Sequence, residues 1–355
     1  MMVKRFITRF EKQDMHFVAK HGFFRAARMV RAHKKKHNAP FIADTYQLAH
    51  ELGVRRRELF GLTRHPEYHY RILTLRKRNG GLRVLHAPLY QMKQVQQHIL
   101  KRILPHLPVS PYATAYVQGK ALADNAAPHV GHKYLLKMDI TDFFGSITYL
   151  QVLSTAFPST FYPPQIGAML TDLCCYKEAL PQGAPTSPTL SNIVMCRFDN
   201  AIGGWCKKRG IAYTRYCDDL TFSADTPLYH VYEKVKDKLE GMGFAVNERK
   251  THFVTAASRQ TVTGLTVNEK VAIPADYKRQ LRQEVYYAIR FGLADSINQG
   301  GKPFRTIGNN PDVRRYYNHL NGKLNYVLQV EPHNRWFACA KEDLRRQFED
   351  EICRW

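Results

Sequence analysis

Asp139, Asp218 and Asp219 are the residues of this sequence best suited to chemistry. Asp139 lies near the end of the apolar run YLLKMDI (134–140), and the other two are adjacent within IAYTRYCDDLTFSA (211–224). Ionised carboxylates that are held together repel one another and are costly to bury unpaired. Mg²⁺ relieves that repulsion, since it binds through a few carboxylates plus substrate phosphates. Two such ions about 3.5–4 Å apart would clamp an in-line phosphoryl transfer.

The predicted local structure places these acids where such a site could form. An Asp-Asp pair alone is common in exposed turns, and a single Asp139 indicates still less. Short alternating runs flank Cys217-Asp218-Asp219, which predicts a β-hairpin with the acids at its turn. The apolar run before Asp139 predicts a strand. Placed side by side in a fold, the three acids would form one divalent-cation site.

Other elements follow from periodicity and turn residues. Basic helices are predicted over residues 1–39, and their outer face is either solvated or in contact with nucleic acid. Asp44 is the predicted N-cap of a short helix that Gly53 closes. Two β-like runs flank Asn79-Gly80, which predicts a hairpin with a basic tip. From about Ala275 onward the pattern is helical and basic.

The charge balance indicates a polyanionic partner. The 355-residue chain has 53 Lys and Arg residues against 30 Asp and Glu residues, a formal net charge of +23. Such an excess is typical of a nucleic-acid enzyme or a nucleic-acid-binding protein. No apolar run reaches the roughly eighteen residues of a membrane span, and the seven cysteines form no zinc pattern. Without a secretory signal, we expect a reducing, cytoplasmic location.

Several ordered motifs together resemble those of reverse transcriptases. KMDITDFF (137–144) is similar to their motif A, PQGAPTSP (181–188) to motif B, YCDD (216–219) to motif C and FAVNERKTHF (244–253) to motif D, while YRILTLRKRNGGLRV (70–84) resembles the fingers hairpin. Most members have Ala or Met where this chain has Cys217, which is also small enough for the turn. The resemblance, over about residues 66–268, implies an α+β, right-hand polymerase fold. Its parts would be fingers, a palm of antiparallel sheet flanked by helices, and a helical thumb.

The resemblance implies a metal-dependent, RNA-directed DNA polymerase. Asp139 and Asp218 would be the principal ligands of two Mg²⁺ ions, which Mn²⁺ could replace, with Asp219 beside them. The backbone carbonyl of Ile140 would add a ligand. Lys250, in the motif D segment, would donate a proton to the leaving pyrophosphate.

Selection of the sugar is assigned to a phenylalanine. Phe144 lies five residues after Asp139, at the position of the family's steric gate, where a bulky ring excludes a 2′-hydroxyl. Phe143 is then the core residue of the pair, although the two roles could be reversed.

Four more residues would bind the incoming deoxynucleoside triphosphate. Gln182 and Gly183 would line its pocket, where glycine allows close approach to the template base pair. Lys77 and Arg83, in the fingers hairpin, would hold the triphosphate.

Two short motifs are similar to signatures of retron reverse transcriptases. Asn125-Ala-Ala-Pro-His129 matches the NAxxH motif that these enzymes carry before motif A, and Val262-Thr263-Gly264 matches their VTG triplet. These residues are candidates for RNA binding. His129 could instead hold its loop in shape through a hydrogen bond to backbone.

Retron type implies a specific reaction and specific partners. Such an enzyme binds a structured noncoding RNA (msr-msd) and begins DNA synthesis from the 2′-hydroxyl of one guanosine in it, which yields branched RNA-linked DNA (msDNA). Antiphage defence with a separate effector protein is also implied. No second nuclease-like acidic cluster occurs, so a host RNase H would remove the template RNA.

The expected division of the chain follows from the same resemblance. Residues 1–65 would be a basic helical extension, 66–268 the fingers and palm, and 269–355 a basic thumb that recognises the cognate RNA. Arginines and tyrosines suit contacts with RNA, although about half of the tyrosines would instead pack between helices. The tyrosines concerned are Tyr286, Tyr287, Tyr316, Tyr317 and Tyr326.

Two alternatives remain open. A reverse transcriptase of a group II intron or diversity-generating element would share the motifs, but intron enzymes usually carry a maturase domain. A non-catalytic basic RNA-binding scaffold or antitoxin would share the charge, but it would not require all of Asp139, Asp218 and Asp219.

Overall fold

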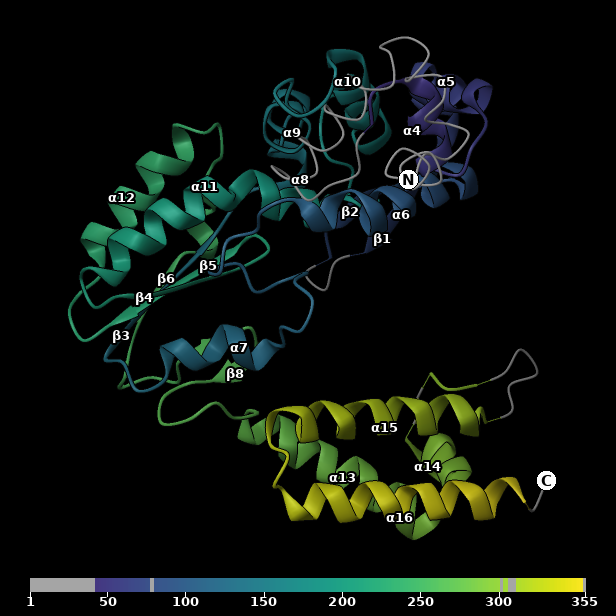
Figure 1. The fold of residues 1–355 in the computed structure, drawn as a ribbon. Helices are drawn as coiled ribbons and strands as arrows, with labels where there is room; N and C mark the ends of the chain where they lie inside the picture. Colours follow the sequence, from purple (N-terminus) through teal and green to yellow (C-terminus); the bar gives the residue numbers. More distant parts are fainter. Residues whose placement is uncertain (1–41, 77–79, 301–302, 306–310, 354–355) are drawn as a thin grey trace, which may run out of the picture. The chain divides into compact units, whose positions relative to one another are not determined.

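The computed structural model describes residues 42–76, 80–300, 303–305 and 311–353. The described chain divides into two compact units, and Figure 1 labels most of their helices and strands. The first unit is drawn from segments 1–120, 136–221 and 228–252. The second is drawn from segments 121–135, 222–227 and 253–355.

From residue 42 onward, the first unit contains short helices whose ends follow capping rules. Asp44 caps α4 (Thr45–Glu51), because its Oδ1 accepts hydrogen bonds from the backbone N–H groups of Tyr46 and Gln47 at 2.9 and 3.0 Å. Gly53 follows this helix with φ +68°, as the sequence predicts. Further helices of this region are α5 (Arg56–Arg64), η1 (Pro66–His69), α6 (Tyr90–Arg102) and η2 (Leu104–His106).

The predicted hairpin around Asn79-Gly80 is confirmed. Strand β1 (Tyr70–Arg76) pairs antiparallel with β2 (Leu82–Pro88), and the register runs from Tyr70 opposite Pro88 to Arg76 opposite Leu82. Gly80 has φ +83°, which glycine adopts without steric cost.

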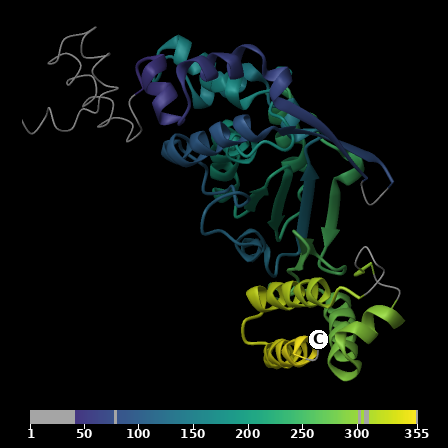
Figure 2. The same cartoon turned by 90° about the vertical axis from the view of Figure 1, so that its right-hand side faces the viewer.

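A four-stranded sheet with strand order β4-β5-β3-β6 carries the acidic segments (Figure 2). Its strands are β3 (Tyr134–Asp139), β4 (Ala212–Tyr216), β5 (Asp219–Ala224) and β6 (His252–Thr255). Helix α11 packs against β4 and α9. The accompanying helices are α8 (Phe143–Ser146), α9 (Tyr149–Ala156), α10 (Pro164–Cys174), α11 (Ser187–Lys207), α12 (Tyr229–Glu240) and η4 (Glu248–Lys250). The mixture of sheet and helices confirms the predicted α+β class.

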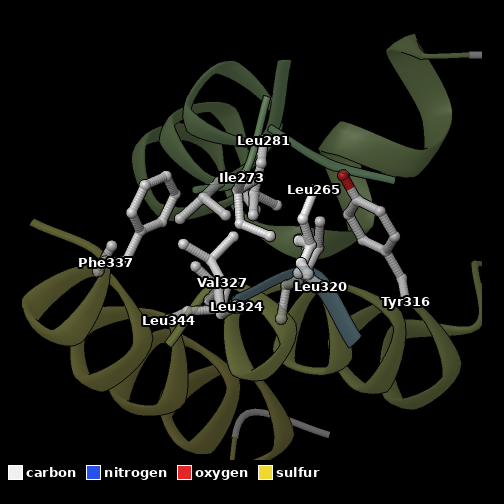
Figure 3. Packing of buried hydrophobic residues seen from close by; sticks show 14 of the residues in the cluster. Leu265, Ile273, Leu281, Tyr316, Leu320, Leu324, Val327, Phe337 and Leu344 are labelled. Atoms are coloured by element: carbon white, nitrogen blue, oxygen red, sulfur yellow. The ribbon is translucent and has the colours of Figure 1, made fainter. Parts of the chain in front are cut away.

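The second unit is mainly helical, as the basic C-terminal pattern predicts. Its elements are α7 (Leu122–Ala126), η3 (Ala127–His129), β7 (Thr261–Val262), β8 (Leu265–Thr266), α13 (Ala275–Phe291), α14 (Leu293–Gln299), α15 (Val313–Val330) and α16 (Arg335–Ile352). Figure 3 shows how Leu281, Leu324 and Phe337 from three of these helices share one core. Leu265 and Val262 belong to the same core, so the VTG segment folds with the C-terminal helices.

Two global properties bear on the predictions from composition. Within the described ranges, no helix has both the length and the apolar character needed to cross a lipid bilayer. All seven cysteines are free thiols, and the five of them in the first unit are buried.

Candidate catalytic site

The connection between β4 and β5 places the acidic pair at a tight turn. Cys217 and Asp218 alone join the strands, and Asp219 begins β5. Cys217 has φ +60°, a conformation that suits the first position of a two-residue hairpin turn. The Cys217 side chain is buried, which agrees with the expectation that a small residue is tolerated there.

Backbone hydrogen bonds bring Asp139 to this turn. The N–H of Ile140 donates to the carbonyl of Asp218 at 3.1 Å, while the N–H of Asn247 donates to the carbonyl of Asp139 at 2.8 Å. The end of β3 is thus bonded to the β4–β5 turn on one side and to the segment before Lys250 on the other. Asp139, Asp218 and Asp219, separated by about eighty residues in sequence, meet as the sequence predicts.

The carboxyl group of Asp219 is influenced by the charges of the two other acids. Partial burial, followed by the charges of Asp218 and Asp139, raises the pKa of Asp219 to about 6. Lys250 supplies a counter-charge to Asp139, because its Nζ lies 2.8 Å from Oδ2 of that carboxylate. The hydrogen bond to Asp139 raises the pKa of Lys250, and the other two carboxylates add to the effect.

These residues fit divalent cations bound partly by substrate. In the described part of the chain, no three acidic, histidine or cysteine side chains already form a closed metal cluster. Mg²⁺ does not need one, since it commonly binds through one or two carboxylates together with phosphate oxygens and water. Desolvation, followed by repulsion from Asp218 and Asp139, raises the pKa of Asp219, and a bound cation would favour its ionised form. The carbonyl of Ile140 remains a predicted ligand.

Gln182 and Gly183 lie directly against the fingers strand β2. The carbonyl of Gln182 accepts a hydrogen bond from the N–H of His86 at 2.9 Å, and its Nε2 lies 3.3 Å from Oδ1 of Asp142. Gly183 has φ +120°, and a Cβ at this position would lie 3.2 Å from the His86 carbonyl oxygen. Glycine is therefore required here by backbone conformation and by space.

The two phenylalanines of motif A differ in exposure. Phe143 is 3% exposed and packs near Phe244, with ring centroids 6.1 Å apart, whereas Phe144 is only partly buried. Phe143 is therefore the core residue. Phe144 has the accessible ring that a steric gate needs. Its role as the gate stays a prediction.

We expect Phe144→Ala to admit ribonucleotides. Removing the ring opens the space that a 2′-hydroxyl would occupy, so discrimination against ribonucleoside triphosphates should fall by at least about tenfold, which corresponds to 1.4 kcal/mol. Single-nucleotide incorporation with dGTP and GTP measures the ratio of kcat/KM values. If discrimination between dGTP and GTP is unchanged in Phe144→Ala, the assignment of the steric gate to Phe144 is wrong.

The predicted triphosphate clamps are only partly described. Arg83 lies on β2 with an exposed side chain, which leaves it accessible to an incoming nucleotide. Lys77 lies outside the described residues. Both assignments remain predictions.

A buried ion pair next to the β4–β5 turn was not predicted from the sequence. Arg215, on β4, and Asp199, on α11, are both 0% exposed, and Nη2 of Arg215 lies 2.6 Å from Oδ2 of Asp199. Nε of Arg215 donates to both carboxylate oxygens, and Nη1 donates to the carbonyl of Cys217 at 3.0 Å. The sequence feature that could have indicated this pair is the charged Arg215 inside a strand whose other residues predict burial.

The two short signature motifs lie side by side in the second unit. Helix α7, which contains Asn125, packs against β8, which follows the VTG triplet. Thr263 and Gly264 have φ +46° and +83°, so they form the turn between β7 and β8, while Val262 is a core residue. The conformation resembles the type I′ hairpin turn. RNA binding by these residues remains a prediction.

His129 is completely buried, with Nδ1 2.8 Å from the Ser223 hydroxyl. This geometry supports its structural alternative, although its partner is a side chain rather than the expected backbone group. Any contact with RNA would be made by the residues around it. Burial, with a smaller effect of His132, lowers the pKa of His129 to about 3.

The low pKa of His129 predicts acid sensitivity of folding. Folded His129 stays neutral down to about pH 3, whereas the unfolded histidine takes up a proton near pH 6.5. The contribution of His129 to the free energy of unfolding is therefore complete above pH 6.5. It is lost as the pH falls, by about 2 kcal/mol at pH 5. Urea unfolding at pH 7.5 and pH 5 should show a smaller loss for His129→Gln than for the wild type. His333→Gln, at an exposed histidine, serves as the control; equal losses in all three proteins would contradict the prediction.

Comparison with known proteins agrees with this geometry. The family model described as "Reverse transcriptase (RNA-dependent DNA polymerase)" matches residues 75–272, which include the acidic site, Gln182 and Lys250. The chain belongs to the reverse transcriptases.

Its curated relatives define the type within that family. The Retron Ec86 reverse transcriptase of Escherichia coli is 36% identical over 272 residues, 75% of this chain and 78% of that protein. The Retron Ec83 enzyme of E. coli is 32% identical, over 76% of this chain and 86% of its own length. The Retron Mx65 enzyme of Myxococcus xanthus is 33% identical, over 79% of this chain and 66% of its own length. The protein is a retron-type reverse transcriptase.

Solved structures share a more distant likeness. A telomerase from Candida albicans in complex with a fragment of telomeric RNA matches 79% of this chain and 59% of its own, at 12% identity and a TM-score of 0.43. An apo telomerase from Candida tropicalis matches at 16% identity and a TM-score of 0.41, over 58% of this chain and 55% of its own.

Proposed function

We propose that this retron-type, RNA-directed DNA polymerase copies part of one cognate structured RNA into DNA, beginning at the 2′-hydroxyl of a guanosine in that RNA. The product would be branched RNA-linked DNA, and its use would be antiphage defence with a separate effector protein. The meeting of Asp139 with the Asp218-Asp219 turn carries the proposal. It supplies the chemistry, and the retron relatives supply the type of template.

Each side chain of the site has a proposed task. Asp139 and Asp218, with Asp219 beside them, would hold two Mg²⁺ ions, which activate the attacking hydroxyl and stabilise the charge of the leaving pyrophosphate when bound. Lys250 is already 2.8 Å from Asp139. It would move from that carboxylate to the pyrophosphate and donate its proton there.

Nucleotide selection would follow from the segments beside the acids. Gln182 and Gly183 would lie under the new base pair, and Phe144 would face the sugar. Arg83 and Lys77 would hold the triphosphate. The absence of a side chain at Gly183 allows motif B to approach the backbone of β2 closely, since an added Cβ would lie 3.2 Å from the His86 carbonyl oxygen.

Recognition of the RNA is proposed for the second unit. Tyr286 and Tyr287 on α13 are 58% and 44% exposed, which suits stacking with unpaired bases. Tyr316 is fully buried and packs in the core. Tyr317 stacks on Phe348 at 4.0 Å, and Tyr326 packs edge-on against Tyr277 at 5.7 Å, so these rings serve helix packing.

The test is to purify the full chain with the nucleic acid that binds it in its native cells. Mg²⁺ and labelled deoxynucleotides should extend the bound RNA into DNA, and a debranching enzyme specific for 2′–5′ links should separate DNA from RNA. Digestion by RNase H should remove the copied template. DNA joined to a free 3′ end would contradict the retron priming reaction, and no DNA on any structured RNA would contradict the polymerase activity.

A further inference from the structure

Tyr116 is an exposed ring held in a strained backbone next to the catalytic turn. It has φ +58°, a genuine outlier for a bulky residue, and its side chain is 53% exposed. Such strain persists where the surrounding structure imposes it, commonly at functional sites. The residues just before it are packed away, since Ala113 and Ala115 are each 1% exposed.

The loop that carries Tyr116 is fixed along β4. Ala113 forms a parallel bridge with Arg215, and the N–H of Thr114 donates to the Arg215 carbonyl at 2.9 Å. Nδ2 of Asn192 on α11 donates to the carbonyl of Ala115 at 2.8 Å. In a parallel register, the residues after Thr114 run beside the residues after Arg215. Tyr116 therefore lies beside the turn.

The side chain of Tyr116 lies near Cys217 of the β4–β5 turn, as the pairing of its loop with Arg215 requires. Partial burial and the adjacent Cys217 thiol raise the pKa of Tyr116, and the charge of Asp218 contributes. An aromatic face that is half open to solvent and adjacent to a proposed metal ligand is suited to contact a substrate.

The position of Tyr116 on the sheet indicates which part of the substrate it meets. The Tyr116 loop lies along β4, at one edge of the order β4-β5-β3-β6, and Lys250 lies just before β6 at the other edge. Asp139 and the Asp218 turn lie between them. In-line phosphoryl transfer puts the attacking hydroxyl and the leaving pyrophosphate on opposite sides of the phosphorus. With Lys250 at the pyrophosphate, Tyr116 is on the side of the nucleophile.

We infer that Tyr116 contacts the nucleotide that carries the attacking hydroxyl, by stacking its ring on that nucleotide's base. This inference rests on the proposed function and adds a residue that positions the nucleophile. Base–aromatic stacking is sequence-tolerant, which suits a site that must hold a priming guanosine first and each new DNA terminus afterwards.

The test is a double-mutant cycle between protein and primer. Duplexes of an RNA template with a DNA primer are prepared with a normal or an abasic 3′-terminal nucleotide. Their affinities for the full-length wild type and for Tyr116→Ala are measured by fluorescence anisotropy, and single-nucleotide extension is measured with Mg²⁺. For the wild type, the abasic terminus should weaken binding by at least about 5-fold, the lower end of stacking energies.

The effects of Tyr116→Ala and of the abasic terminus on affinity should be strongly non-additive, because each change removes the same contact between the ring and the base. Tyr116→Ala should bind normal and abasic termini equally and should keep its KM for the nucleotide. Tyr116→Phe should behave as the wild type, because stacking needs the ring and not the hydroxyl. Tyr229→Ala, which removes another exposed ring of the first unit, should leave the cycle unchanged.

Other outcomes separate the possible failures. Tyr116→Gly removes the ring and relaxes the positive φ, so it gives the same readout if Tyr116→Ala does not fold. An additive cycle, or a rise in the nucleotide KM alone, would overturn the inference. A wild type that makes no DNA would instead defeat the proposed function.

Discussion

The Asp218→Asn variant should lose DNA synthesis by about 1000-fold or more while it retains RNA binding. Asparagine keeps the size of the side chain but removes the charge that a divalent cation requires. Stabilisation by a bound metal amounts to several kcal/mol, and each 1.36 kcal/mol changes the rate tenfold. The turn itself should persist, because its bond from the Ile140 N–H goes to the backbone carbonyl of Asp218.

Primer extension with saturating Mg²⁺ and equilibrium binding of the copurified RNA measure the two effects separately. Asp237→Asn, at an exposed acid on α12, is the matched control and should leave both quantities unchanged. Equal losses of binding and synthesis in Asp218→Asn would place Asp218 in RNA recognition or folding. Retained synthesis would exclude it as a principal metal ligand.

Replacement of Arg215 by methionine should destabilise the first unit by about 3–5 kcal/mol. The change leaves the Asp199 carboxylate buried without its cation, and an uncompensated buried charge costs about that much. The hydroxyl of Tyr213, 2.8 Å from Oδ1 of Asp199, provides only a neutral hydrogen bond in its place. Urea denaturation monitored by circular dichroism at neutral pH measures the loss.

A double replacement separates the two roles of Arg215. Asp199→Leu combined with Arg215→Met removes both charges, so much of the stability should return. The hydrogen bond to the Cys217 carbonyl is absent in both variants, so both should need a higher Mg²⁺ concentration than the wild type for half-maximal synthesis. An exposed ion pair contributes at most about 1 kcal/mol to stability. If Arg215→Met lowered the free energy of unfolding by less than that, the predicted cost of leaving Asp199 charged and buried would be wrong.

Local patterns were sufficient for the parts of the site that depend on nearest neighbours. The positive φ of Gly80 in the β1–β2 hairpin and the Asp44 cap follow from which residues tolerate a given φ or offer a capping oxygen. The β4–β5 hairpin follows from the short alternating runs on either side of its acids. The strand ending at Asp139 follows from its apolar run. These features lie within a few residues of the atoms that determine them, so they can be read without the rest of the fold.

Contacts between distant segments could not be read in that way. The choice between Phe143 and Phe144 depended on whether Phe244 covers the ring, and the two signature motifs became neighbours only through packing of α7 on β8. The burial of His129 against Ser223 is of the same kind. Periodicity predicts that a face is buried, but it does not say against what.

The sequence by itself determined that three carboxylates, a basic hairpin and an ordered set of motifs belong to a reverse transcriptase of the retron type. Tertiary structure decided how the acids are held. Arg215, paired with Asp199, donates a hydrogen bond to the Cys217 carbonyl in the turn. Lys250 donates to Asp139, which lies 111 positions away in the chain, and the Tyr116 loop lies along β4. These contacts depend on burial and strand pairing, because charge pairs and strain acquire their energies only where the completed fold excludes water and fixes the backbone.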